Sequence, residues 1–201
     1  MPGVFGLKKV YNRQRVDNWP ESNNYGYFAG AHVVCTIDRI DFSNETVSLP
    51  GPSLTQARSA LATVSNSNYG YFAGGYVPPS KLCTIDRIDF SSEIVAVPPV
   101  GDQLTESRQG LTAVSNSNYG YFAGGYVPPY VCTIDRIDFS SETVSLPGPS
   151  LTQARTNLTA VSNSNYGYFA GGATLLHYVC TIDRIDFSSE TVSLPGPSLT
   201  Q

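Results

Sequence analysis

The chain has 201 residues, of which 41% are hydrophobic and 14% are charged, and its formal net charge at pH 7 is −4. It lacks the clustered excess of lysine and arginine that phosphate binding requires, which argues against a dedicated nucleic-acid-binding protein. No apolar run approaches the roughly 18 residues of a membrane-spanning helix, and no secretory leader opens the sequence, so we expect a soluble, unprocessed protein without membrane insertion.

The first 22 residues differ in composition from the rest of the chain. They contain four basic residues against two acidic ones, and tandem repeats follow them. We therefore divide the chain into an N-terminal arm, residues 1–22, and a repeat region, residues 23–201. The basic arm is expected to attach the protein to a larger assembly.

Two phrases recur four times each behind the arm. "SNSNYGYFAGGYV" begins at Ser65 and again at Ser115, and close variants cover residues 22–31 and 162–173. Repetition at such a period indicates a stack of similar structural units. One cysteine per repeat is unlike the irregular spacing of a disulfide framework, so we expect reduced, buried thiols. The second phrase, "CTIDRIDF", sets a period of about 48 residues and begins at Cys35, Cys83, Cys132 and Cys180.

Each repeat breaks at turn residues into four short runs that favour β-strands. In "NSN" and "SSE" the side chains can bond nearby backbone, which predicts two tight hairpins, and the prolines after the last run predict that the chain leaves the sheet there. Period-two alternation places Ile134 and Ile137 on opposite faces of one strand. The sequence therefore predicts an all-β chain in which each repeat is a four-stranded antiparallel sheet. In the third repeat the runs are 111–115, 119–124, 133–139 and 143–146.

The order of motifs within a repeat resembles the kelch family. "GYFAGG" ends a strand in paired glycines, "IDRIDFSSETVSLPG" is an acidic strand with its turn, and "LTQAR" brings a later arginine. The resemblance covers residues 24–201 and departs at "ETVSL", which lacks the tryptophan usual after the third strand. It implies a kelch-like β-propeller whose blades are the four repeats. Glycine pairs such as Gly74 and Gly75 then allow close backbone approach.

Three arrangements of the four repeats remain open. They close into a small ring, form an open arc that another chain completes, or belong to a longer gene. In the first repeat the first strand is replaced by "VDNWPES", in which Asp17 and Pro20 disfavour a strand. An open arc exposes apolar blade faces, so we expect self-association if one chain does not close the ring.

The phrase Asp-Arg-Ile-Asp recurs in all four repeats and could be mistaken for acid–base machinery. A catalytic site needs one asymmetric set of residues with different roles, whereas four equal copies favour a structural role. We therefore predict that these arginines bind carboxylates within or across neighbouring sheets, and that the chain is not an enzyme. Arg58, Arg108 and Arg155 are expected to hold the linkers similarly. The phrase comprises Asp38, Arg39, Asp41, Asp86, Arg87, Asp89, Asp135, Arg136, Asp138, Asp183, Arg184 and Asp186.

The repeats differ mainly between the second and third strands, where they read "HVV", "YVPPSKL", "YVPPYV" and "ATLLHYV". These segments fall at one rim of a propeller, and tyrosine is a common contact residue for proteins and sugars. The alternative is that the tyrosines pack the loops themselves. Two histidines, His32 and His177, do not make a metal site, and we expect no cofactor. The predicted ligand-binding residues are Tyr76, Tyr126, Tyr130, His177 and Tyr178.

The arm carries a second resemblance. "GVFGLKKVYNRQRVDNWP" is similar to an N-terminal segment of structural proteins from tailed bacteriophages, especially marine ones, and the blades resemble those of marine viral and microbial open reading frames. This implies a virion component, such as a tail-fibre or surface-decoration protein, assembled in the host cytoplasm. Its partners would be itself, other virion proteins, or a host surface protein or glycan. The alternatives are a cytoplasmic kelch-type scaffold that binds proteins and, behind it, a propeller oxidase or epimerase.

Overall fold

The computed structural model describes residues 24–31, 34–98 and 103–200, so the N-terminal arm and His32 lie outside the described residues. All regular secondary structure in these ranges is β-strand, as the sequence predicts. No helix in these ranges is long and apolar enough to span a membrane.

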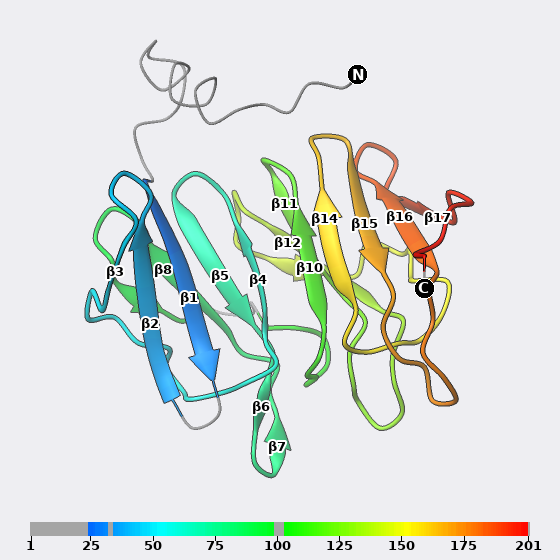
Figure 1. Ribbon diagram of the computed structural model, residues 1–201, viewed down its shortest axis with the longest axis horizontal. Helices are drawn as coiled ribbons and strands as arrows, with labels where there is room; N and C mark the ends of the chain where they lie inside the picture. The colour runs from blue at the N-terminus through cyan, green and yellow to red at the C-terminus, as the bar shows by residue number, and fades with distance from the viewer. Residues whose placement is uncertain (1–23, 32–33, 99–102, 201) are drawn as a thin grey trace.

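The strands form one antiparallel sheet for each repeat (Figure 1). Sheet 1 contains β1 (Tyr25–Ala31), β2 (Val34–Asp41) and β3 (Thr46–Ser48). Sheet 2 contains β4 (Ala62–Ser65), β5 (Tyr69–Ala73), β8 (Ile85–Asp89) and β9 (Val95–Ala96). Sheet 3 contains β10 (Thr112–Ser115), β11 (Tyr119–Ala123), β12 (Ile134–Asp138) and β13 (Val144–Ser145). Sheet 4 contains β14 (Thr159–Ser162), β15 (Tyr166–Ala170), β16 (Ile182–Asp186) and β17 (Thr191–Ser193). A small hairpin consists of β6 (Tyr76–Val77) and β7 (Ser80–Lys81).

The four strands predicted for the third repeat are confirmed, and their bounds differ from the prediction by no more than about one residue at either end. Sheet 1 has three strands among the described residues, because the segment expected in place of its first strand, residues 16–22, lies outside them. The β6–β7 hairpin in the loop of the second repeat was not predicted from the sequence.

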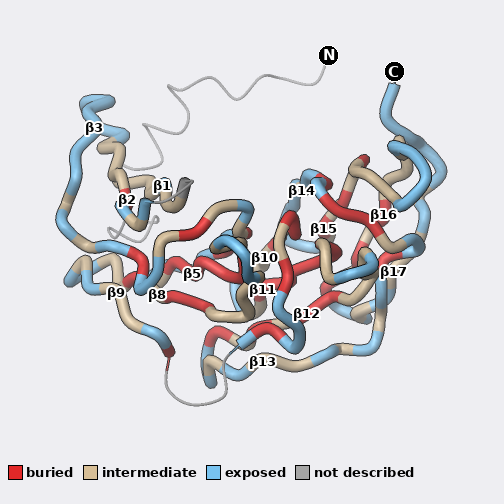
Figure 2. Tube along the Cα trace, turned by 90° about the horizontal axis from the view of Figure 1, so that it is seen from below, coloured by how far each residue is buried: buried red, intermediate tan, exposed pale blue. Residues whose placement is uncertain are grey.

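The four sheets stand in a curved row that follows the order of the sequence (Figures 1 and 2). The first strands of sheets 2, 3 and 4 lie next to one another on the inner side of the curve. Backbone hydrogen bonds join the chain just before these strands, from Gly110 N to the Ala60 carbonyl at 2.9 Å and from Asn157 N to the Gly110 carbonyl at 2.8 Å. Sheets 1 and 4 occupy the two ends of the row, and no hydrogen bond or ion pair between described residues joins them.

Apolar clusters fill the spaces between consecutive sheets (Figure 2). Between sheets 2 and 3, Tyr71 packs with Phe122 and Ile137. Ile134, on the other face of the same strand as Ile137, belongs to the cluster between sheets 3 and 4, which confirms the predicted alternation. Since burial contributes about 25 cal/mol per Å² of apolar surface, each cluster stabilises the contact between two repeats.

Two local features predicted from the sequence are confirmed in the third repeat. Asn116 Oδ1 accepts hydrogen bonds from the backbone nitrogens of Asn118 and Tyr119, both at 2.8 Å, which closes the "NSN" hairpin. Gly124 has a φ of 67°, and a Cβ there would lie 2.6 Å from the Arg155 carbonyl oxygen. Glycine therefore allows the linker to sheet 4 to cross the end of sheet 3 at contact distance.

The cysteines are unpaired, as expected, but half-buried rather than buried, which corrects the prediction. Cys83, Cys132 and Cys180 lie just before β8, β12 and β16, and Cys35 lies at the start of β2, where in each case the following segment of the chain crosses the sheet. The Cys132 carbonyl, for example, accepts a hydrogen bond from Leu151 N at 2.8 Å. In the second repeat the Cys83 thiol contacts Gln103 Oε1 at 3.0 Å. The linker covers these thiols only in part, so water reaches them.

Candidate binding surface

Each described linker between sheets carries one buried arginine. Arg108 Nη2 lies 2.7 Å from Asp135 Oδ2 and donates to the Phe122 carbonyl at 3.1 Å, and both charged side chains are fully buried. Thr105 in the same linker donates to that carboxylate through its backbone nitrogen and its hydroxyl. Burial lowers the pKa of Arg108, and the Asp135 carboxylate opposes the shift, so the arginine stays charged. The equivalent pairs are Arg58 with Asp86 and Arg155 with Asp183.

A second set of polar contacts joins each sheet to the next. The Tyr121 hydroxyl in sheet 3 donates to Glu190 Oε1 in sheet 4 at 3.0 Å, and Arg136 Nη1 lies 2.8 Å from the same oxygen. The Tyr121 ring stacks on Phe187 with centroids 5.3 Å apart. Burial and then the hydrogen bond to Glu190 raise the pKa of Tyr121, so its hydroxyl remains a donor. The equivalent sets are Tyr27 and Arg39 with Glu93, and Tyr71 and Arg87 with Glu142.

These contacts confirm that the Asp-Arg-Ile-Asp phrase carries structural ion pairs and identify its partners. In repeats 2, 3 and 4 the first aspartate binds the linker arginine. In repeats 1, 2 and 3 the arginine of the phrase binds a turn glutamate of the following sheet. The second aspartate stays in its own turn: hydrogen bonds from Ser140 hold the pKa of Asp138 below its ordinary value. Sequence reasoning missed the turn glutamates, although a glutamate follows the third strand in every repeat.

The loops between the second and third strands project from one rim of the row, on the lower side of Figure 1. The "NSN" and "SSE" hairpins lie at the opposite rim. The sequence predicts this placement, and for the described loops of repeats 2, 3 and 4 it is confirmed. We call these three loops, residues 75–83, 125–132 and 172–180, the rim loops.

The first two rim loops touch one another. The rings of Tyr126 and Tyr130 meet edge to face with centroids 5.5 Å apart. Lys81 Nζ, from the preceding repeat, lies 4.6 Å from the centre of the Tyr126 ring. Tyr76 is half-buried, and its backbone nitrogen donates to the Ser59 carbonyl at 2.8 Å. Contacts within the rim loops therefore bury part of the surface of these three tyrosines. Lys81 belongs to the same cluster, although the sequence did not predict it as a binding residue.

The third rim loop exposes the largest apolar surface. Tyr178 is 87% exposed and Leu176 is 89% exposed, beside exposed Leu175 and His177. The His177 carbonyl accepts hydrogen bonds from the backbone nitrogen and hydroxyl of Thr174, which closes the loop into a tight turn. In the described part of the chain no hydrogen bond or ring contact joins Tyr178 or His177 to the other rim tyrosines, so the five predicted residues do not form one pocket. Leu175 and Leu176 were not among the predicted binding residues, although two adjacent leucines in a loop indicate an exposed apolar surface.

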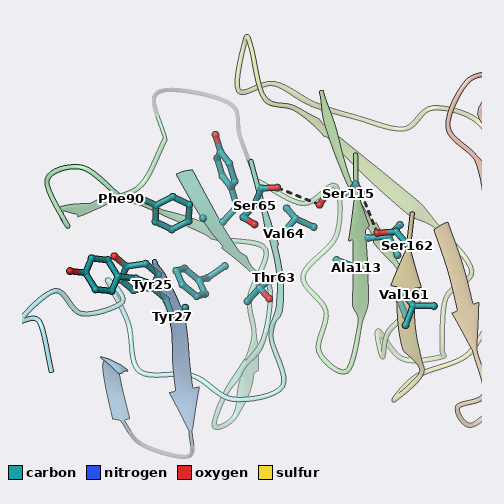
Figure 3. Close-up of a pocket in the computed structure, with 16 residues that line it drawn as sticks. Tyr25, Tyr27, Thr63, Val64, Ser65, Phe90, Ala113, Ser115, Val161 and Ser162 are labelled. Carbon is teal, nitrogen blue, oxygen red and sulfur yellow. Dashed lines mark hydrogen bonds between the residues drawn. The ribbon is translucent and has the colours of Figure 1, made fainter. Parts of the chain in front are cut away.

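A concave space of about 300 Å³ lies on the inner side of the curve (Figure 3). It is lined by β4, β10 and β14 and by parts of sheets 1 and 2. The Ser115 hydroxyl donates to the Ser65 carbonyl at 3.4 Å, and the Ser162 hydroxyl donates to the Ser115 carbonyl at 3.2 Å. The lining contains no carboxylate, imidazole, thiol or amine, so these residues offer no general base at neutral pH.

Neither a group of metal-binding side chains nor a similar known protein indicates a function for this surface. Among the described residues, no three histidine, cysteine, aspartate or glutamate side chains are grouped so that they could hold a metal ion. No protein-family model matches the chain, and no curated protein matches it. The functional argument therefore rests on the chemistry of the rim and of the sheet faces.

Proposed function

We propose that the chain is a non-enzymatic structural and adhesion protein with a kelch-like β-propeller architecture, and that its rim loops bind the partner. One observation carries this proposal: the side chains of Leu176 and Tyr178 are almost fully exposed to solvent on a tight loop at one rim. Exposed apolar and aromatic side chains gathered on one loop are typical anchors of protein and glycan interfaces. The polar side chains of the repeats, in contrast, bind one another between the sheets.

The arrangement of the sheets supports the propeller. Consecutive sheets pack face to face through apolar clusters, and sheets 2, 3 and 4 each place their first strand on the inner side of the curve. Variable loops on one rim of such a rigid scaffold are a common place for binding residues. The inner strands and linkers fix the sheets, and the loops remain available for recognition.

We assign this binding role to a virion, as a tail-fibre or surface-decoration component assembled in the host cytoplasm. The support is the similarity of residues 3–20 to N-terminal segments of phage structural proteins. The arm then attaches the chain, and the rim contacts a host surface protein or glycan. Deleting residues 1–22 is expected to leave the sheets folded, as seen by circular dichroism, and to remove the chain from purified particles. Particles that retain the truncated chain at the wild-type level would contradict attachment through the arm.

A double substitution tests the rim. Leu176→Ser with Tyr178→Ser removes the exposed apolar anchors without touching a buried residue, so we expect unchanged stability and at least about tenfold weaker binding. The probe is the fluorescently labelled chain, titrated onto intact bacterial cells and onto immobilised bacterial surface polysaccharides.

The matched control is Ile94→Ser with Leu146→Ser, which removes two exposed apolar side chains near the outer strands β9 and β13. This control is expected to bind like the wild type. If the rim variant also binds like the wild type, or if the wild-type chain binds none of these surfaces, the rim is not an adhesion site.

A further inference from the structure

The contact between sheets 3 and 4 defines two different faces. Sheet 3 offers Val114, Tyr121 and Arg136, which we call the donor face. On sheet 4, Phe169 packs into the shared cluster, Phe187 stacks on Tyr121, and Glu190 binds Tyr121 and Arg136. We call this side of sheet 4 the acceptor face. Equivalent residues join sheet 2 to sheet 3 and sheet 1 to sheet 2.

Sheet 4 also carries a donor face, and this one has no partner among the described residues. Val161 is 69% exposed, whereas the equivalent Val114 is 4% exposed in the interface. The Arg184 guanidinium donates to Ser193 of its own sheet at 3.3 Å and lies over the Tyr166 ring, 4.8 Å from its centre, but it forms no ion pair with a described carboxylate. Tyr168 makes no side-chain hydrogen bond to a described residue, and Leu199 is exposed although its counterpart Leu151 is buried.

Sheet 1 carries the matching acceptor face, also without a partner among the described residues. Phe28 is 63% exposed, whereas the equivalent Phe169 is fully buried. Phe42 is exposed, whereas Phe187 is buried beneath Tyr121. The carboxylate of Glu45 forms no ion pair with any described arginine, although Glu93, Glu142 and Glu190 each bind one.

We propose that sheet 4 of one copy of the chain docks on sheet 1 of a second copy, head to tail. Arg184 and Tyr168 then bind Glu45 of the second copy, Tyr168 stacks on its Phe42, and its Phe28 packs beside Val161. Charge, hydrogen-bond donors and apolar side chains thus match in the same way as in the three interfaces within one chain. The proposal goes beyond rim binding and does not depend on it.

The geometry favours a second copy over the first sheet of the same chain. Sheets 1 and 4 lie at opposite ends of the curved row (Figure 2), and among the described residues both faces lack a partner at the same time. Because the two faces differ, the contact between copies is heterologous, and such contacts join chains into rings or filaments.

Charge reversal tests the contact. Glu45→Arg damages only the acceptor face and Arg184→Glu only the donor face, so each variant alone is expected to associate at least about tenfold more weakly than the wild type. When the two variants are mixed, an intact donor face meets an intact acceptor face, and at the other interface the exchanged charges at positions 45 and 184 are again opposite, so association to at least about twice the 21.6 kDa chain mass is expected. The readout is light scattering after size-exclusion chromatography.

Two controls keep the result interpretable. Glu106→Arg makes the same charge change at an exposed position outside both faces and is expected to associate like the wild type. Circular dichroism establishes that each variant is folded. A wild-type chain with the mass of a single copy, or a mixture of the two variants that stays monomeric, would overturn the proposal.

Discussion

The linker arginines are charged residues held where water does not reach. Arg108 keeps its charge because Asp135 compensates it and because the Phe122 carbonyl accepts a further hydrogen bond. A buried pair of this kind adds little net stability over apolar packing, but removing one member leaves the other charge uncompensated. These arginines therefore fix where each linker crosses its sheet, and replacing one is expected to lower the free energy of unfolding substantially.

Replacing Arg108 with methionine leaves Asp135 buried, with Thr105 as its remaining donor. We expect the free energy of unfolding to fall by about 3–5 kcal/mol, measured by urea denaturation. Arg184→Met is the matched control, because no described carboxylate pairs with that arginine, and its cost should stay below about 1 kcal/mol. Both variants are measured with Glu45→Arg, so that association does not contribute. Equal losses would show that the buried pair is not the cause.

At the scale of elements, the strands could be predicted because their signals are local. In the third repeat the alternation of residues 134–138 and the turn residues at both ends fix one strand within a few positions. The partner of Arg136 could not be predicted, since Glu190 lies in the next repeat and meets it only through the packing of two sheets. The half-buried cysteines depend likewise on where the linkers cross. The rim tyrosines were placed on the correct side, but their division into packed and exposed residues depends on loop geometry.

The phenylalanine of the second strand separates an internal sheet from an end sheet. Phe169→Ala empties a fully buried position between sheets 3 and 4 and is expected to lower the free energy of unfolding by about 3–5 kcal/mol. Phe28→Ala changes the same position of the first repeat, where the side chain is exposed, and should cost less than about 1 kcal/mol. The comparison uses chains with Arg184→Glu, followed by urea denaturation. Similar costs would mean that Phe28 is already buried in the isolated chain.

At the scale of the whole molecule, repetition gives every internal sheet one donor face and one acceptor face. A row built in this way ends in one face of each kind, and in the part of the chain that the structure describes, these faces of sheets 1 and 4 have no partner. The rim loops project from an edge of the sheets, whereas the donor and acceptor faces are the broad sides of the sheets (Figures 1 and 2). Association through the faces therefore leaves the rim free, and several copies joined head to tail would present many rims to one surface, which raises avidity.

The most direct test of this account is an experimental structure of the full chain in its associated state, by crystallography or electron cryo-microscopy. The account predicts an ion pair of about 4 Å or less between Arg184 of one copy and Glu45 of the next, with Tyr168 stacked on Phe42 of that copy. An Arg184 side chain paired with Glu45 of its own chain, or donor and acceptor faces left in solvent, would contradict it.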